Sequence, residues 1–421
     1  MKILMPKKVN TIIHTFQTHG YEAYAVGGCV RDSVLGRVPE DWDITTSAMP
    51  WQTKALFRRT FDTGIAHGTI TVLIEDEAFE VTTYRIDGEY EDGRHPKQVE
   101  FTRSLQEDLL RRDFTMNAMA YNDQEGLVDV FHGLEDLKGG FIRCVGNPDE
   151  RFAEDALRIL RAVRFAAQLG FEIEEKTKEA ARKAASSLEK ISAERIQSEL
   201  VKLLISDKPQ CLYILRELQI TKVILPEFDD LFYQTKPLEA SFYNVGNHTV
   251  ASVCAVPGEK VLRLAMLLHE MEGEHTVKHI LKRFKFDNDT LRKVCRLVAF
   301  HGYHISSTDQ DVRIALHQIG SDLFLDYLKV KVADAEAFGE NHQEVVRAMA
   351  EIKARYLGIL QRGECISLRE LAVTGSDLIQ QGISPGKQIG EVLNALLEVV
   401  LRNPEYNKKE YLLSYVNKYF Q

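Results

Sequence analysis

The 421-residue sequence lacks the usual marks of a secreted or membrane-spanning protein. Its six cysteines are scattered without C-x-x-C spacing, so neither a zinc site nor a disulfide framework is expected. No apolar segment approaches the length of a membrane span, and the apolar run at the N-terminus is too short for a signal peptide. These absences predict a cytoplasmic protein with free thiols.

An excess of basic residues is also missing. The 53 lysines and arginines are outnumbered by 62 acidic residues, which gives a net charge of −9. This balance weakens the expectation of a nucleic-acid partner without excluding one, because binding depends on the local field over the contact surface. The chain length predicts roughly two to four domains.

Strand signals are almost absent after Pro148. Before it, two β-rich runs at 68–75 and 78–85 are separated by Asp76 and Glu77 and predict a hairpin. After it, helical patterns follow one another, beginning with a long one at 149–169. The sequence therefore predicts an α+β fold, with a mixed-sheet head followed by an elongated, all-helical remainder. The predicted domains are a head at 1–147, a neck at 148–205, a body at 206–300 and a tail at 301–421.

A glycine turn follows the first apolar run of the head. Gly27 and Gly28 separate residues 24–26 from a short helical segment that stops at Gly36. Two glycines let the backbone approach an anion closely, and the first-turn N–H groups of a helix favour phosphate oxygens. Arg31 adds a planar fork of donors. The pattern predicts a phosphate-binding turn at Gly28 and Arg31.

Two aspartates come shortly after this turn. Asp41 and Asp43 read as the start of a second strand, where side chains two apart project to the same face. They can therefore bind a common pair of magnesium ions. Glu80 faces the same cleft if its neighbours Phe79 and Val81 pack inward. Either motif alone is usually structural, but together they are the parts needed for two-metal phosphoryl or nucleotidyl transfer.

A second charged pattern lies at 154–165, EDALRILRAVRF. Asp155, Arg158, Arg161 and Arg164 recur at spacings of three, which on one helix is either a solvated salt-bridge ladder or a recognition surface. Cytosine and adenine present an amino donor beside a ring-nitrogen acceptor, whereas uracil and guanine present the reverse. A carboxylate beside a guanidinium matches only the first pair. Asp155 and Arg158 would then select C and A.

These motifs resemble those of a known family. GGCVRD with DWD resembles the catalytic motif of the polymerase-beta-like nucleotidyltransferase superfamily, in the form shared by bacterial CCA-adding tRNA nucleotidyltransferases and poly(A) polymerases. RRDFTMNA, in the helix-prone segment 108–120, and EDALRILRAVRF resemble two further motifs of the class II CCA-adding enzymes. The resemblance covers roughly the first 200 residues. It implies addition of C, C and A to the 3′ end of tRNA from CTP and ATP, with release of pyrophosphate.

The resemblance also implies a role for each matching residue. Gly28, Arg31 and Arg112 would contact the triphosphate or the nucleotide. Asp41 and Asp43 would bind the metal ions, and Glu80 matches a further acidic position of the family. Asp155 and Arg158 would read the base, with Arg161 and Arg164 supporting that site.

Three alternatives remain from the sequence. A bacterial poly(A) polymerase shares the catalytic motif, but the segment DTGIAHGT at 62–69 resembles the CCA-adding form and the C-terminus is not strongly basic. In a CC-only enzyme the loop before the RRDFT motif would be shortened, whereas the segment 85–96 looks intact here. The polar segment 87–97, which contains Asp87 and Arg94, is predicted to be a mobile loop. An RNA-binding protein with a degenerate head is the non-enzymatic alternative, and the intact D-x-D opposes it.

The helical remainder carries two weaker signals. Lys278, Lys282, Arg283 and Lys285 belong to its densest basic cluster, which is either a solvated helix face or, given the resemblance, a contact to tRNA phosphates. The segment from His269 to His275 reads H-E-x-x-x-x-H, which is not the spacing of zinc proteases, and a phosphohydrolase of the H-D type would have Asp at Glu270. We therefore expect polar residues at a helix end rather than a second active site. The oligomeric state is open, a homodimer included.

Overall fold

The chain forms two compact units. The computed structural model describes residues 1–88, 99–238, 241–271, 273–339 and 342–420. The units are Met1–Asp229 and Asp230–Gln421. Within the described ranges, no helix combines the length and the apolar character needed to cross a membrane. The finer division into head, neck, body and tail stays a prediction.

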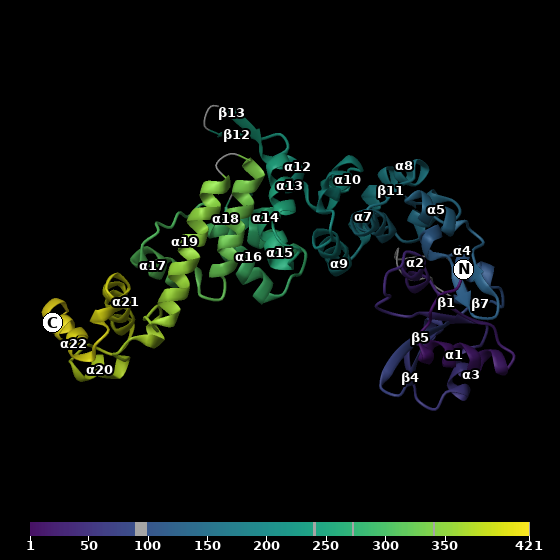
Figure 1. Cartoon of the computed structure of the whole chain (residues 1–421), viewed down its shortest axis with the longest axis horizontal. Coiled ribbons are helices and arrows are strands. Elements are labelled where there is room, and N and C mark those ends of the chain that lie inside the picture. Colours follow the sequence, from purple (N-terminus) through teal and green to yellow (C-terminus); the bar gives the residue numbers. More distant parts are fainter. Residues whose placement is uncertain (89–98, 239–240, 272, 340–341, 421) are drawn as a thin grey trace. The chain divides into compact units, whose positions relative to one another are not determined.

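A mixed seven-stranded sheet organises the first unit, with strand order β3-β4-β5-β2-β1-β8-β9. Its strands β1, β4 and β5 are labelled in Figure 1. Its strands are β1 (Ala23–Val26), β2 (Ile44–Thr46), β3 (Thr60–Gly64), β4 (Thr69–Ile74), β5 (Glu77–Thr83), β8 (Ala120–Asn122) and β9 (Gly126–Val128). Only β2 and β5 pair in parallel; the other neighbours are antiparallel. The hairpin of β4 and β5 confirms the predicted one, and the α+β class is confirmed.

The head also contains several short helices. Its helices are α1 (Lys7–Thr18), α2 (Gly28–Val34), α3 (Pro50–Leu56), α4 (Leu105–Leu110) and α5 (Gly133–Gly139), with short 3-10 turns η1 (Ile65–His67) and η2 (Thr115–Asn117). Helix α1 turns Val9, Ile12, Ile13 and Phe16 into the core beside β1. The predicted helical segment 108–120 is wrong beyond Leu110, because its chain turns through η2 and enters β8.

The predicted loop at 87–97 lies mostly outside the described residues, and so does Arg94. Its first residue, Asp87, is not in a loop: it ends β6 (Arg85–Asp87) and pairs with Val99 of β7 (Val99–Phe101). The two strands therefore bring the ends of this segment together.

The rest of the first unit is mainly helical. It contains α6 (Pro148–Glu154), α7 (Leu157–Leu169), α8 (Glu175–Ala184), η3 (Ala185–Lys190), α9 (Ala193–Leu204), η4 (Pro209–Cys211), α10 (Leu212–Glu217) and α11 (Thr221–Ile224), and α12 (Pro226–Leu231) spans the unit boundary. A short parallel pair, β10 (Phe141–Ile142) with β11 (Glu172–Ile173), interrupts the helices. The long helix predicted at 149–169 is wrong in one respect, since it is broken at Asp155.

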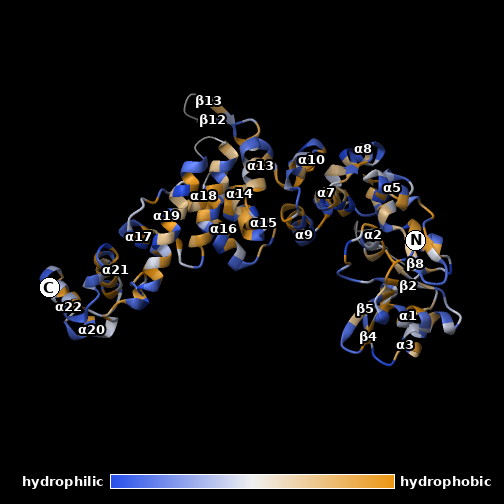
Figure 2. Ribbon diagram, in the orientation of Figure 1, coloured by the Kyte–Doolittle hydropathy of each residue, from blue (hydrophilic) through white to orange (hydrophobic). Residues whose placement is uncertain are grey.

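The second unit packs helices around buried apolar faces. Its elements are β12 (Thr235–Leu238), β13 (Ser241–Asn244), α13 (Val245–Ala255), α14 (Lys260–Leu268), α15 (Glu274–Arg283), α16 (Asn288–Phe300), α17 (Asp309–Ile319), α18 (Phe324–Phe338), α19 (His342–Gln361), η5 (Leu368–Glu370), α20 (Gly375–Gln380), α21 (Lys387–Arg402), η6 (Pro404–Tyr406) and α22 (Lys409–Tyr419). Helix α14 packs against α13, α16 and α18. Figure 2 shows α14 as largely hydrophobic, in contrast to the hydrophilic α8 of the first unit. The hairpin β12–β13 was not predicted, so the remainder is not wholly helical.

Candidate active site

The glycine turn between β1 and α2 lies against two guanidinium groups. Gly27 has a φ of +82°, which favours glycine. A Cβ atom on Gly27 would lie 3.0 Å from Nη1 of Arg112, and one on Gly28 would lie 3.7 Å from Nη2 of Arg31. The absence of side chains therefore lets two cations approach the same stretch of backbone. This arrangement suits a polyphosphate anion.

Arg31 is held in a fixed orientation. Its Nε and Nη2 donate to the Asp32 carboxylate at 2.9 and 2.8 Å, and its Nη1 donates to Oδ1 of Asn117 at 2.8 Å. Its guanidinium also lies 5.1 Å from the ring centroid of Phe165. These contacts leave little freedom to the side chain, so its charge is directed before any ligand binds.

Arg112 is fixed through a buried carboxylate. Asp108 is fully buried and lies 3.5 Å from Nη2 of Arg112 and 2.7 Å from Nη2 of Arg111. Burial raises the pKa of Asp108, but the two arginines outweigh that effect and lower it below the ordinary value. The Nε of Arg112 is buried without a hydrogen-bond partner. Arg112 thus keeps donor capacity beside the glycine turn.

The two aspartates come just before a strand rather than within it. Strand β2 begins at Ile44, and the Asp43 carbonyl accepts a hydrogen bond from the Val26 N–H at 3.0 Å. Both side chains are solvent-exposed. Because Ile44 pairs with Val81 in the parallel β2–β5 ladder, the register places Asp43 beside Glu80. The register therefore brings Glu80 near this pair, and its part in metal binding stays a prediction.

The carboxylates influence each other electrostatically. Loss of solvation raises the pKa of Asp43, the charge of Arg112 opposes that rise, and Glu80 and Asp41 add to it. Repulsion among neighbouring carboxylates of this kind is relieved by a bound cation. Hard oxygen donors open to water fit Mg²⁺, which keeps several of its water ligands.

One cleft joins the turn to the aspartates. It has a volume of about 660 Å³, and its lining includes Gly28, Arg31, Asp41 and Asp43 together with residues of α7 and α9 such as Arg164 and Lys202. The phosphate-type donors and the metal-type acceptors therefore open into the same space.

The segment expected to read the base is not one continuous helix. Asp155 has φ −143° and ψ 102°, which is an extended conformation between α6 and α7. Its Oδ1 accepts from the Leu157 N–H at 3.0 Å, and its Oδ2 accepts from Nη2 of Arg195 at 2.6 Å. The predicted ridge on one helix is thus corrected. Asp155 caps the start of α7 and is anchored by α9.

Arg158 has a different set of partners. Its Nη1 donates to Oε2 of Glu154 at 2.6 Å, and its Nη2 donates to the Arg111 carbonyl at 2.9 Å. Arg158 is 8% exposed, so these bonds compensate a charge that is nearly removed from water. Glu154 was read as part of the motif, but its role as the anchor of Arg158 was not predicted.

Arg161 and Arg164 pair with carboxylates on other elements. Arg161 binds Oδ2 of Asp113 through Nε at 2.8 Å and Nη2 at 2.6 Å, and Arg164 lies 2.8 Å from Glu199. Burial raises the pKa of Asp113, but the charge of Arg161 and its hydrogen bonds lower it well below the ordinary range. Burial lowers the pKa of Arg164 to about 10. The solvated ladder is therefore wrong for these two arginines.

A hydrogen-bonded chain connects α7 to the glycine turn. Asp113, bound to Arg161, also accepts from Nδ2 of Asn117 at 3.1 Å, and Oδ1 of Asn117 accepts from Arg31. Both Asp113 and Asn117 belong to RRDFTMNA, so their place in that motif was the signal that could have identified them. The predicted basic residues Lys278, Lys282, Arg283 and Lys285 lie apart from this site, in the second unit.

Comparison with known proteins identifies the family. A family model described as the poly A polymerase head domain matches residues 23–143, and one described as tRNA nucleotidyltransferase domain 2 matches residues 259–416. A CCA-adding enzyme of Pediococcus pentosaceus is 37% identical over 97% of this chain and 96% of its own length. The chain belongs to the CCA-adding enzyme family. The CCA-adding enzyme of Enterococcus faecalis is likewise 37% identical, over 98% and 96% of the two chains.

A solved CCA-adding enzyme shares the fold along its full length. The Bacillus stearothermophilus CCA-adding enzyme, crystallised in complex with CTP, has a TM-score of 0.78 and 30% identity, with coverage of 99% of this chain and 98% of the other. The full-length relatives favour the CCA-adding enzyme over the poly(A) polymerase, which shares the head. Family membership also rejects the non-enzymatic alternative: the CCA-adding enzymes are tRNA nucleotidyltransferases, and this chain is one of them. Nucleotidyltransferases of this family are generally metal-dependent.

Proposed function

We propose that the cleft of the first unit carries out CCA addition with the residues identified from the sequence. In this proposal the 3′-hydroxyl of a tRNA attacks the α-phosphate of CTP twice and then that of ATP, and pyrophosphate leaves each time. The observation that carries the proposal is the opening of the glycine turn, with Arg31, into the same cleft as Asp41 and Asp43, while Arg112 lies against the same turn. The relative crystallised with CTP supports the choice of nucleotide.

The triphosphate is assigned to the glycine turn. Arg31 is oriented by Asp32 and Asn117, and Arg112 has donor capacity to spare. Two fixed guanidinium groups would hold the β- and γ-phosphates and orient the α-phosphate toward the aspartates. The pyrophosphate then leaves from the side on which its charge is compensated.

Asp41 and Asp43 are assigned to two Mg²⁺ ions, with Glu80 as a further acidic neighbour. Their exposed carboxylates and the raised pKa of Asp43 support a cation at this place. When bound, such ions lower the pKa of the attacking hydroxyl and compensate the charge of the triphosphate. The protein holds these carboxylates just before the first residue of β2, and the pairing of β2 with β5 fixes the position of that strand end.

Base choice is assigned to Asp155 and Arg158. Arg195 and the start of α7 fix the carboxylate, and Glu154 fixes the guanidinium, so neither group needs the other to hold its position. A carboxylate retains acceptor capacity after two hydrogen bonds, and a guanidinium has five donors. The pair would accept an amino donor and a ring-nitrogen acceptor, and a wrong base would leave a desolvated charge unpaired.

The proposal also covers the loop segment and the contacts to tRNA. The segment containing Asp87 and Arg94 acts in the change from C to A addition. Deletion of residues 87–97 tests this assignment: C addition is expected to survive and A addition to be impaired. Lys278, Lys282, Arg283 and Lys285 contact tRNA phosphates. A cytoplasmic location and a homodimer stay predictions.

The direct test is addition to a radiolabelled tRNA transcript that lacks its last three nucleotides. The transcript is incubated with magnesium and CTP, ATP or both, and the products are resolved at single-nucleotide level. Two additions with CTP and a third only with ATP present are expected. Arrest after two with both nucleotides would instead identify a CC-only enzyme, and a long ladder with ATP alone would identify a poly(A) polymerase.

A further inference from the structure

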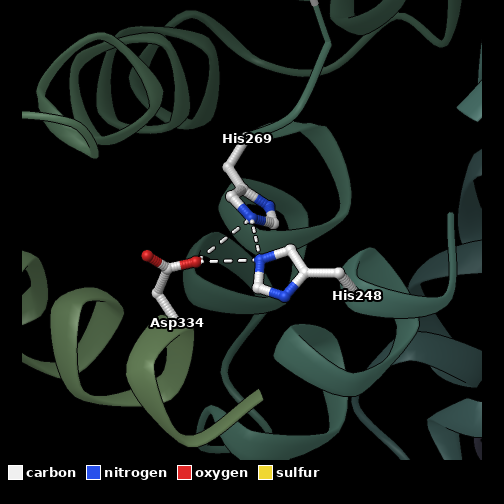
Figure 3. Close-up of side chains that lie close together, drawn as sticks. All are labelled: His248, His269 and Asp334. Atoms are coloured by element: carbon white, nitrogen blue, oxygen red, sulfur yellow. Dashed lines mark hydrogen bonds and ion pairs between the residues drawn. The ribbon is translucent and has the colours of Figure 1, made fainter. Parts of the chain in front are cut away.

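Three side chains in the second unit converge on one point inside its helical core. They are His248 of α13, His269 at the C-terminal end of α14, and Asp334 of α18 (Figure 3). Nε2 of His248 lies 3.0 Å from Oδ1 of Asp334 and 3.3 Å from Nε2 of His269, and the latter atom lies 3.5 Å from the same oxygen. The two histidines are 5% and 3% exposed. Three potential metal ligands therefore share a site that is largely closed to water.

A hydrogen bond from His269 to a group outside the cluster directs a lone pair into it. Nδ1 of His269 is 2.7 Å from the Met266 carbonyl, which can only accept, so Nδ1 carries the hydrogen. In the neutral imidazole, Nε2 then presents a lone pair to the other two groups. A histidine whose outer nitrogen donates to a backbone carbonyl is the usual form of a metal ligand.

His248 is left incompletely satisfied. Its Nδ1 is buried without a hydrogen-bond partner, while its Nε2 faces Asp334, His269 and, at 3.3 Å, Oγ of Ser252. A hydrogen on this Nε2 can be donated well to only one of these groups. An aspartate carboxylate is ordinarily ionised at neutral pH, so Asp334 brings a negative charge to the cluster. A divalent cation would use both Nε2 lone pairs and this charge at once.

The distances fit the coordination of a small divalent ion. Bonds of about 2.0–2.1 Å place neighbouring ligands roughly 3.3 Å apart around a tetrahedral ion and roughly 2.9 Å apart around an octahedral ion. The observed separations of 3.0, 3.3 and 3.5 Å span these values. Two imidazoles with one carboxylate favour zinc, cobalt, nickel or manganese over magnesium.

The surroundings hold the ligands and provide access. The ring of Phe338 stacks on His248 with a centroid distance of 3.9 Å. Glu270 lies 3.8 Å from Nε2 of His248 and is itself held by Lys236 at 2.5 Å and by the Tyr243 hydroxyl at 3.0 Å. A cavity of about 280 Å³ reaches His248 from the side of Tyr243 and Asn247. The cavity therefore opens beside one of the three ligands.

We propose that His248, His269 and Asp334 bind one divalent transition-metal ion through two Nε2 atoms and one carboxylate oxygen, separately from nucleotide addition. Three protein ligands leave at least one coordination position for water. The sequence did not predict this site because the H-E-x-x-x-x-H segment supplies only His269. The other two ligands come from different helices, and His275 is exposed on α15.

The test measures metal content and cobalt absorption of the full chain. The protein is stripped with a chelator, incubated with Zn²⁺ or Co²⁺ in the absence of Mg²⁺ and nucleotide, and desalted. Wild type is expected to retain about one ion per chain, with Co²⁺ giving the visible absorption of a nitrogen- and oxygen-ligated ion. His248→Ala and Asp334→Ala should lose this ion. His248→Gln and Asp334→Asn, which keep the side-chain volume, should lose it while circular dichroism remains that of wild type.

Matched controls exclude other sites. His279→Ala removes an exposed histidine from α15, Cys254→Ser removes the exposed thiol of α13, and Asp43→Ala alters the first unit. All three should retain the ion. Absence of bound metal in wild type, or retention in both His248→Gln and Asp334→Asn, would overturn the proposal and leave an imidazolium–carboxylate pair. Loss only in Asp43→Ala would overturn it as well, since the metal would then belong to the first unit.

Discussion

The polar sites of the two units balance their charges in opposite ways. In the first unit three arginines of the candidate site each have a carboxylate partner: Arg31 has Asp32, Arg158 has Glu154, and Arg161 has Asp113. The carboxylates of Asp41 and Asp43, by contrast, are exposed. In the second unit the Nε2 atoms of His248 and His269 and the carboxylate of Asp334 are directed at one another.

This difference indicates how each site would be completed. Exposed carboxylates that repel each other need a cation, but water can hydrate them until a nucleotide arrives with its magnesium. Buried lone pairs have no such alternative, because an unsatisfied polar group inside a protein is costly. We therefore expect an exchangeable metal in the first unit and a resident one in the second, and the following variants can break or sharpen that distinction.

The largest effect is expected at Asp43. Asp43→Ala removes a metal ligand and should lower the rate of nucleotide addition by at least about 1,000-fold, because several kcal/mol of charge stabilisation are lost. Single-turnover addition of CTP to the tRNA transcript measures this, and metal content of the second unit should not change. Asp76→Ala, a fully exposed aspartate in the β4–β5 turn, is the control. Near-normal addition by folded Asp43→Ala would refute the metal assignment.

The next effect concerns the buried pair of Asp113 and Arg161. Asp113→Ala should lower the free energy of unfolding by about 3 kcal/mol, the lower end for a broken buried pair, because the Arg161 side chain is still 34% exposed. The pKa of Asp113 is lowered on folding, so its stabilisation is present above its unfolded pKa of about 3.9 and is lost as the pH falls toward the folded value. Urea unfolding at about 25 °C, repeated between pH 3 and pH 7 and followed by tryptophan fluorescence, measures both effects.

Fluorescence is selective here because both tryptophans, Trp42 and Trp51, lie in the first unit. The acid-induced loss of stability should be smaller in Asp113→Ala than in wild type, and Asp76→Ala should keep the wild-type slope. An unchanged slope in Asp113→Ala would mean that Asp113 does not stabilise the unit through its charge.

The same two regions show what local sequence can and cannot predict. The glycine turn, the hairpin and the aspartates were predictable because each depends on neighbours within a few residues. Even Glu80 could be inferred, since strand alternation fixes its face. The break at Asp155 could not, because residues on both sides are compatible with a helix and the break is held by Arg195 from α9.

The sequence did not reveal which distant residues the charged side chains of the two sites would contact. Asp113 and Glu199 pair with arginines 48 and 35 positions away, and the ligands of the histidine cluster come from three helices. Periodicity tells which side of a helix is apolar, but it does not tell which distant carboxylate will meet an arginine there. Only the packing of the helices determines that.

A smaller effect is expected from the anchor of Arg158. Glu154→Gln keeps the side-chain shape but removes the charge that holds the guanidinium. The preference for CTP over UTP should then fall about tenfold, which corresponds to roughly 1.4 kcal/mol. The ratio of kcat/KM for the two nucleotides measures it. Glu150→Gln, an exposed glutamate one turn earlier on α6, is the control. Equal selectivity in Glu154→Gln and wild type would show that Arg158 keeps its position without this partner.

The smallest effect separates the surface of the second unit from its buried cluster. Lys278 and Lys282 are exposed and lie one turn apart on α15. If they contact tRNA phosphates, each alanine substitution should weaken tRNA binding by a few-fold and reduce the slope of log K against log salt by about one. Lys387→Ala, at the exposed start of α21, should leave that slope unchanged. Zinc content should be the same in all three variants, because the ion is held by direct coordination and not by long-range attraction to surface charges, which salt screens. A lysine variant that lost zinc, or a salt slope equal to wild type in both Lys278→Ala and Lys282→Ala, would contradict this separation.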